Sequence, residues 1–151
     1  EQIPQGRPVS VERETFPGLA ANGTLYALPS DTYWLDTGTP QQFIQANLDM
    51  LNGKRKQVPH LPDASIDPKS LIKQSVIGNG SEIEAGAVID KSVLLDRCQI
   101  GANSEVLGSV LSEDVHVGQG ARLDGCVIGR GQHIQPGELL INESRPEVDP
   151  I

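Results

Sequence analysis

The sequence predicts a mainly β protein whose carboxy-terminal half is a parallel β-helix, and two observations lead to this fold class. Residues 75 to 142 divide into four consecutive rows of 17 residues: SVIGNGSEIEAGAVIDK, SVLLDRCQIGANSEVLG, SVLSEDVHVGQGARLDG and CVIGRGQHIQPGELLIN. A regular repeat of this kind indicates a solenoid. Aromatic residues make up only 3% of the chain and glycine occurs 16 times, which predicts an aliphatic core and many tight turns.

Large aliphatic residues recur along these rows with spacings of 6, 6 and 5 residues. An α-helix has a period near 3.6 and an ordinary strand a period of 2, so neither produces this pattern. The spacing is expected for a three-sided coil in which each short face contributes one aliphatic side chain to a shared interior. The 12 predicted interior positions are Ile77, Ile83, Ile89, Leu94, Ile100, Val106, Leu111, Val117, Leu123, Ile128, Ile134 and Leu140.

Other columns of the repeat, meaning residues 17 positions apart, agree with such a coil. Small residues are expected where a turn leaves little room, at Ser81, Ala87, Cys98, Ser104 and Ala121. Glycine directly after an aliphatic residue suits a corner, at Gly78, Gly101, Gly118 and Gly129.

The repeat extends to an earlier, degenerate coil. Ile66 and Ile72 lie 17 residues before Ile83 and Ile89. We therefore expect the β-helix to begin near Val58 and to occupy residues 58–142, with about five coils in all. Residues 143–151 are expected to form a polar tail whose first part caps the last coil, because an open end would expose unpaired backbone groups.

Residues 1–55 have a different composition, with two helical signals. Ser10 is expected to cap a short helix through Phe16, and Thr39 to cap a second helix with Pro40 as its first residue. The second helix should end at Asn52-Gly53. Its apolar stripe consists of Ile44, Leu48 and Leu51.

Between these helices, β-branched and aromatic residues predict strands over 24–28 and 32–35. A segment of this size cannot bury much core by itself. Residues 1–55 are therefore predicted to be the carboxy-terminal end of a larger α/β domain.

Charge and cysteine content exclude several classes of function. A net charge of −8 argues against nucleic acid or an anionic membrane as partner. The chain has no apolar run long enough to span a membrane, and Cys98 and Cys126 do not suggest a disulfide framework. We expect a soluble cytoplasmic protein.

Two strings in the first 55 residues resemble a known family. Residues 6–17, GRPVSVERETFP, and residues 33–40, YWLDTGTP, resemble the end of the catalytic domain of sugar-1-phosphate nucleotidyltransferases. Within that family the resemblance is to bacterial mannose-1-phosphate guanylyltransferases (GDP-mannose pyrophosphorylases). Such enzymes join an α/β domain to a left-handed β-helix of hexapeptide repeats, so the resemblance implies the left hand.

The resemblance also implies a reaction and a site. Asp36 matches a family aspartate that binds Mg²⁺ beside the nucleotide and sugar phosphates. Glu12 and Glu14 match positions near the sugar. The substrates would be GTP and mannose 1-phosphate, and the β-helix would serve oligomerisation or regulation. No string like the family's glycine-rich phosphate loop occurs here, so these 151 residues alone are expected to be inactive.

Several alternatives stay open at this point. Asp36 could simply shape a turn, and Glu12 could simply favour the first turn of a helix. A glucose-1-phosphate thymidylyl- or uridylyltransferase would fit the same strings. A hexapeptide-repeat acyltransferase would use a histidine as general base, and His116 and His133 share a column with Glu82 and Gln99. The β-helix could also serve assembly alone.

Overall fold

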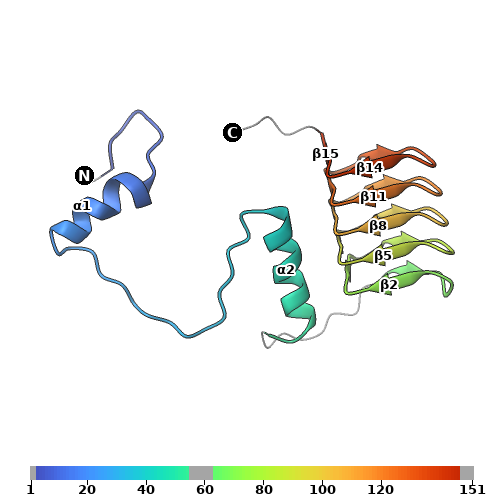
Figure 1. Ribbon diagram of the computed structural model, residues 1–151, viewed down its shortest axis with the longest axis horizontal. Coiled ribbons are helices and arrows are strands. Elements are labelled where there is room, and N and C mark those ends of the chain that lie inside the picture. The colour runs from blue at the N-terminus through green and yellow to red at the C-terminus, as the bar shows by residue number, and fades with distance from the viewer. Residues whose placement is uncertain (1–2, 55–62, 147–151) are drawn as a thin grey trace. The chain divides into compact units, whose positions relative to one another are not determined.

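The computed structural model describes residues 3–54 and 63–146 (Figure 1). The chain divides into two compact units, Glu1–Thr32 and Tyr33–Ile151. In the described part of the second unit, short parallel strands stack as a β-helix of about five coils, which confirms the predicted fold class. The left-handed sense of the coil stays a prediction.

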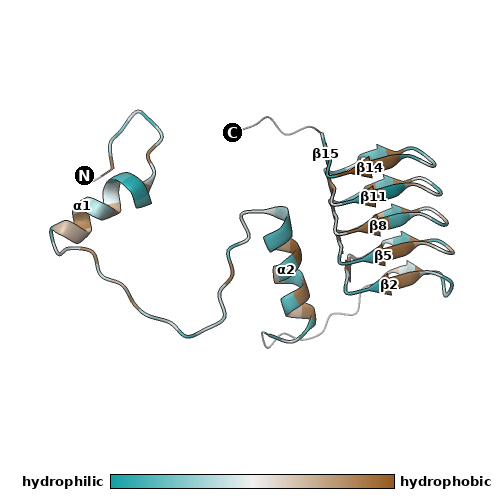
Figure 2. Ribbon diagram, viewed as in Figure 1, coloured by the Kyte–Doolittle hydropathy of each residue, from teal (hydrophilic) through white to brown (hydrophobic). Residues whose placement is uncertain are grey.

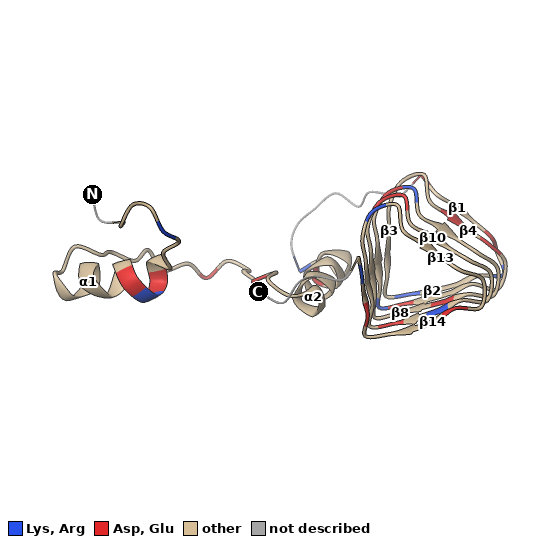
Figure 3. Ribbon diagram, turned by 90° about the horizontal axis from the view of Figure 1, so that it is seen from above, with Lys and Arg blue, Asp and Glu red and all other residues tan. Residues whose placement is uncertain are grey.

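The β-helix has three faces, and each face is a parallel sheet of five short strands (Figure 3). Sheet A contains β1 (Ser65–Ile66), β4 (Glu82–Ile83), β7 (Gln99–Ile100), β10 (His116–Val117) and β13 (His133–Ile134). Sheet B contains β2 (Leu71–Lys73), β5 (Val88–Asp90), β8 (Glu105–Leu107), β11 (Arg122–Asp124) and β14 (Leu139–Ile141). Sheet C contains β3 (Val76–Ile77), β6 (Val93–Leu94), β9 (Val110–Leu111), β12 (Val127–Ile128) and β15 (Ser144–Arg145).

Neighbouring strands pair residues that are 17 positions apart, so the register follows the sequence repeat. Ile100, for example, lies between Ile83 and Val117 in sheet A. All twelve predicted interior residues are buried, and none is more than 9% exposed. Burying one such side chain stabilises the fold by about 2 kcal/mol. Figure 2 shows the apolar colouring on these strands, and the shared aliphatic interior is the main source of stability.

The predicted earlier coil is present. Ile66 pairs with Ile83, and Ile72 pairs with Ile89. Ile66 is 42% exposed, because β1 has a sheet neighbour on one side only among the described residues. Val58, where the coil was predicted to begin, lies outside the described residues, as does the predicted boundary between residues 55 and 58.

The last coil ends in a strand. β15 pairs with β12, so the predicted polar tail begins with an extension of sheet C. Arg145 in this strand forms an ion pair with Glu138 at 2.7 Å. Residues 147–151 of the predicted tail lie outside the described part.

The glycines that follow an aliphatic residue are explained by close stacking of the coils. A side-chain β-carbon at Gly118 would lie 2.5 Å from the backbone nitrogen of Pro136 in the next coil. One at Gly78 would lie 2.4 Å from the carbonyl carbon of Leu95. A side chain at either glycine would require the neighbouring backbone to shift, whereas the positive φ angles of the coil fall at other corner positions. Six of those corner residues are not glycine: Gln74, Lys91, Arg97, Asn103, Asp114 and Asn142.

A ladder of hydroxyl groups runs along one buried edge of the coil. The backbone N–H of Ser92 donates to Ser75 Oγ at 3.0 Å, and that of Ser109 donates to Ser92 Oγ at 3.1 Å. The N–H of Cys126 donates to Ser109 Oγ at 2.9 Å. Buried N–H groups need such partners, so this column is restricted to small residues, most of them with a hydroxyl acceptor.

Both predicted helices and their caps are present, but the first helical segment ends at Ala21 and not at Phe16 as predicted. Ser10 Oγ accepts from Arg13 N at the start of a π-helical turn, η1 (Val11–Thr15), which continues into α1 (Phe16–Ala21). Thr39 Oγ1 accepts from Gln42 N at 3.2 Å at the start of α2 (Pro40–Leu51). Of the residues in the predicted apolar stripe of α2, Ile44 is buried, whereas Leu51 is 57% exposed. α2 lies against β3 within the second unit.

The two strands predicted before α2 are wrong. Residues 24–28 and 32–35 are not strands in the structure. A strand requires a neighbour for its backbone hydrogen bonds, and the described residues supply none here. Tyr26, Leu28 and Trp34 are consequently 88%, 94% and 80% exposed.

Candidate functional site

Asp36 lies at the end of an extended segment, just before α2. Its Oδ1 accepts a hydrogen bond from the N–H of Gly38 at 3.1 Å, so the side chain shapes the turn that leads to the Thr39 cap. The residue is exposed, and Oδ2 has no hydrogen-bond partner among the described residues. The turn therefore orients the carboxylate and leaves one oxygen available to a ligand.

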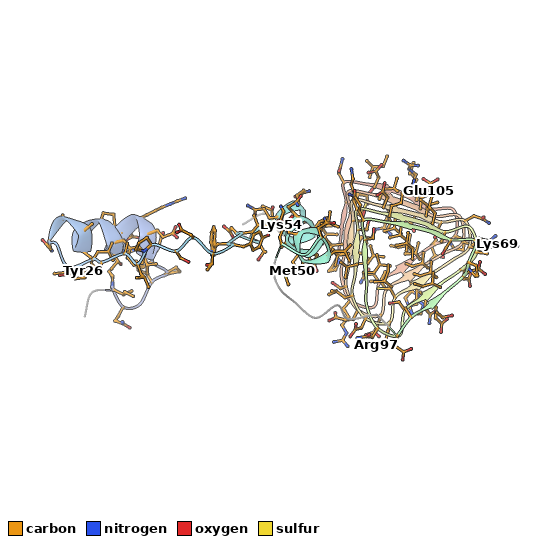
Figure 4. All side chains as sticks on the ribbon, turned by 90° about the horizontal axis from the view of Figure 1, so that it is seen from below. Tyr26, Met50, Lys54, Lys69, Arg97 and Glu105 are labelled. Atoms are coloured by element: carbon orange, nitrogen blue, oxygen red, sulfur yellow. The ribbon has the colours of Figure 1, made fainter. Side chains whose placement is uncertain are left out.

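Asp49 anchors this segment to α2, a role that the sequence analysis missed. Its carboxylate is buried and accepts from the Tyr33 hydroxyl at 2.7 Å and from Gln45 Nε2 at 2.7 Å. Lys54 forms an ion pair with it at 2.8 Å, and Figure 4 shows Lys54 near the end of α2. The bonds from Lys54 and then Tyr33 lower the pKa of Asp49 below its ordinary value.

One spacing in the sequence could have revealed part of this anchor. Gln45 and Asp49 are four residues apart, a spacing that places the two side chains next to each other on a helix. Tyr33 begins the string that resembles the nucleotidyltransferases, and the bond to Asp49 raises the pKa of its hydroxyl. The geometry thus ties the start of that string, three residues before Asp36, to a rigid helix.

The two glutamates of the first unit differ in their contacts. Glu14 forms an ion pair with Arg7, with 2.6 Å between Nη2 and Oε2, and this pairing lowers the pKa of Glu14. Glu12 is exposed and makes no side-chain hydrogen bond or ion pair in the described part of the chain. Of the two, Glu12 is therefore available to a ligand. It belongs to the unit Glu1–Thr32, whereas Asp36 belongs to the unit Tyr33–Ile151.

A shallow groove of about 440 Å³ runs along the outer side of sheet A. His116 and His133 pair in register on β10 and β13, and their rings stack with centroids 4.4 Å apart and planes 12° apart. Glu82 and Gln99 continue the same column toward β4. The predicted polar column is thus confirmed. The paired strands follow the 17-residue register without an inserted loop.

The described residues lack both a cluster of metal ligands and a membrane-spanning helix. They contain no group of three or more histidine, cysteine, aspartate or glutamate side chains placed to hold a metal ion. None of their helices has the length and apolar character needed to cross a membrane. Asp36 is thus not part of such a cluster within the described residues.

A comparison with known families identifies the β-helix. A family model described as the GMPPB C-terminal domain matches residues 55–145, which includes all five coils. The chain belongs to this family. The match covers the 17-residue repeats, so membership in the GMPPB C-terminal domain family rests on the β-helix.

Three relatives are named as mannose-1-phosphate guanylyltransferases or guanyltransferases. A mannose-1-phosphate guanylyltransferase of Mycobacterium tuberculosis is 38% identical over 99 residues, covering 57% of this chain and 27% of that protein. A mannose-1-phosphate guanylyltransferase catalytic subunit beta of Danio rerio is 34% identical over 79 residues, covering 47% and 22%. A mannose-1-phosphate guanyltransferase of Yarrowia lipolytica is 42% identical over 53 residues, covering 35% and 15%. The chain spans about a quarter or less of the length of these relatives.

Proposed function

We propose that this chain is the carboxy-terminal part of an enzyme that makes GDP-mannose from GTP and mannose 1-phosphate. The observation that carries the proposal is the family match over residues 55–145, together with the names of the relatives. The exposed apolar side chains Tyr26, Leu28 and Trp34 support it further. In this proposal, each of these exposed apolar side chains would pack against the remainder of an α/β catalytic domain.

In this proposal Asp36 contributes one carboxylate ligand to Mg²⁺. The Gly38 N–H orients the carboxylate, and its second oxygen is open to solvent, which suits a hard oxygen-binding cation. When bound, the ion would neutralise phosphate charge while a sugar-phosphate oxygen attacks the α-phosphorus of GTP and pyrophosphate leaves. The Tyr33–Asp49 bond would hold the segment that carries Asp36, and Glu12 would contact the sugar.

The proposed role of the β-helix is to assemble or regulate the enzyme. Regular outer faces provide surfaces that a second copy can pair with across a symmetry axis. We also propose a cytoplasmic location, which the two buried free thiols, Cys98 and Cys126, support.

The function is tested by a substrate panel on the complete natural polypeptide that carries these residues. We expect pyrophosphate release with GTP and mannose 1-phosphate to exceed the release with TTP or UTP and glucose 1-phosphate. A preference for the second pair would replace the guanylyltransferase assignment with that of a thymidylyl- or uridylyltransferase. The 151 residues alone are expected to release no pyrophosphate with either pair.

The metal assignment is tested by Asp36→Ala in the same polypeptide. Loss of a charged group that stabilises the transition state lowers turnover by about 100-fold, and more Mg²⁺ should be needed for half-maximal rate. Asp31→Ala is the matched control, because Asp31 is an exposed aspartate that precedes the same string. An unchanged rate and unchanged Mg²⁺ dependence in Asp36→Ala would remove Asp36 from the site.

A further inference from the structure

The stacked histidine pair on sheet A has the chemistry of a transition-metal ligand. His116 and His133 lie directly opposite each other on adjacent parallel strands, with ring centroids 4.4 Å apart. Neutral imidazole is a preferred ligand of Zn²⁺, Cu²⁺ and Ni²⁺. His133 is exposed and His116 is half-buried, so both rings can be reached from solvent.

The groove beside the rings leaves room for the remaining ligands of a metal ion. Gly118 lies two residues after His116 and has no side chain, and Gly101 holds the same position in the previous coil. Gln99 and Gln135 line the groove, and neither side chain makes a hydrogen bond or ion pair within the described residues. Water molecules or these amide oxygens can therefore complete the coordination.

We propose that His116 and His133 form a two-histidine binding site for a divalent transition-metal ion. Zinc–nitrogen bonds are about 2.0 Å long, so a tetrahedral ion needs the two ligating nitrogens roughly 3.3 Å apart. The rings are stacked at 12° to each other, so both must tilt before their ligating nitrogens face one ion. The paired strands hold the two side chains side by side, and the open groove leaves room for this tilt. Glu82 and Glu84 line the same groove and add negative charge that favours a cation.

The cysteines and Asp36 do not compete with the two histidines for a transition-metal ion. Cys98 and Cys126 are buried, and burial raises the pKa of the Cys98 thiol to about 11. A thiol binds metals as the thiolate, so Cys98 stays inert at neutral pH. Asp36 offers a single hard oxygen ligand and suits Mg²⁺ rather than these ions. The histidine site is thus independent of the proposed nucleotidyl transfer.

Metal binding here would stabilise the carboxy-terminal coils. The two ligands belong to β10 and β13, so the ion would join the fourth and fifth strands of sheet A. A ligand that binds only the folded state raises its stability according to ligand concentration and affinity. We therefore expect the chain's midpoint of thermal unfolding to rise when Zn²⁺ is added.

The test uses the 151-residue chain without an affinity tag, titrated with ZnCl₂ in a calorimeter. We expect one Zn²⁺ per chain, with weaker binding at acid pH because protonated imidazole has no free ligand nitrogen. His116→Asn and His133→Asn should each weaken binding by about 100-fold, since each leaves a single histidine arm. His60→Asn is the matched control, because His60 is the third histidine of the chain and does not share the 17-residue column of His116 and His133.

Electron paramagnetic resonance with Cu²⁺ provides a second reading that does not depend on stability. The spectrum should show nitrogen coupling from two imidazoles, reduced to one in either variant. Circular dichroism in EDTA checks that the variants fold. Absence of Zn²⁺ binding, binding unchanged in both variants, or binding lost in His60→Asn would overturn the proposal.

Discussion

At the scale of single residues, the buried aliphatic side chains of the β-helix interior contribute most of the stability of the fold. Ile100 is 1% exposed and lies between Ile83 and Val117, while Gln99 on the same strand points outward. Ile100→Asp would bury an unpaired charge, and we expect the free energy of unfolding to fall by about 4 kcal/mol or more. Urea unfolding followed by circular dichroism measures this. Gln99→Asp should stay near the parent value, and an unperturbed Ile100→Asp protein would contradict the inward register.

Glycine occurs in the coil for two different reasons, close stacking against the next coil and a positive φ angle, and two substitutions can distinguish them. Gly118 faces the next coil so closely that an alanine would displace its backbone, and we expect Gly118→Ala to cost about 2 kcal/mol. Gly120 has open space and a φ of +68°, and Asn103 holds the equivalent position with a φ of +55°. Gly120→Asn should therefore unfold at nearly the parent urea concentration. Equal losses in both variants would show that close stacking is not the reason.

At the scale of elements, the corners between sheets C and A carry an ion-pair cluster. Asp114 accepts from Arg97 Nε at 2.6 Å and from Arg130 Nε at 3.1 Å (Figure 4 shows Arg97 at the outside of the coil). The Arg97 bond, above all, holds the pKa of Asp114 below its ordinary value of 3.8. A carboxylate with a depressed folded-state pKa contributes stability above its unfolded pKa, and this is lost as pH falls through the folded value.

Asp114→Asn should accordingly remove part of the acid dependence of stability. We expect the variant to be less stable than the parent at neutral pH, and the gap to close below about pH 4, where the parent loses the same interaction. Urea unfolding over that pH range measures both proteins. Asp90→Asn in sheet B is the control, because Asp90 makes no side-chain ion pair among the described residues. A gap that persists at low pH would show that the pairing is not the cause.

Periodic elements were predictable from the sequence, whereas the two strands that have no pairing partner among the described residues were predicted wrongly. The 6, 6, 5 spacing predicted the register of three sheets, because each aliphatic residue reports the face that it occupies. The strands predicted at 24–28 and 32–35 were wrong, since strand-forming residues form a ladder only beside a partner. The Ser75 to Ser109 column was visible as a repeat, but its hydrogen bonds became apparent only once the coils were stacked.

At the scale of the whole molecule, the candidate site was only partly predictable. The strings around Glu12 and Asp36 indicated chemistry by resemblance, and the structure adds that Glu14 is engaged by Arg7 while Glu12 is not. The Tyr33–Asp49 anchor was missed because it joins residues 16 positions apart that share no motif. The family match covers residues 55–145 and establishes the family of the β-helix. The reaction of the enzyme is a proposal that rests on this match.

The most direct test of that proposal is an exchange of segments with a relative. The part of the Mycobacterium tuberculosis mannose-1-phosphate guanylyltransferase that aligns with this chain is replaced by the matching residues of this chain. GDP-mannose formation from GTP and mannose 1-phosphate is then measured in the purified chimera, with circular dichroism confirming its fold. We predict that the folded chimera makes GDP-mannose, and a folded chimera that makes no GDP-mannose would contradict the account.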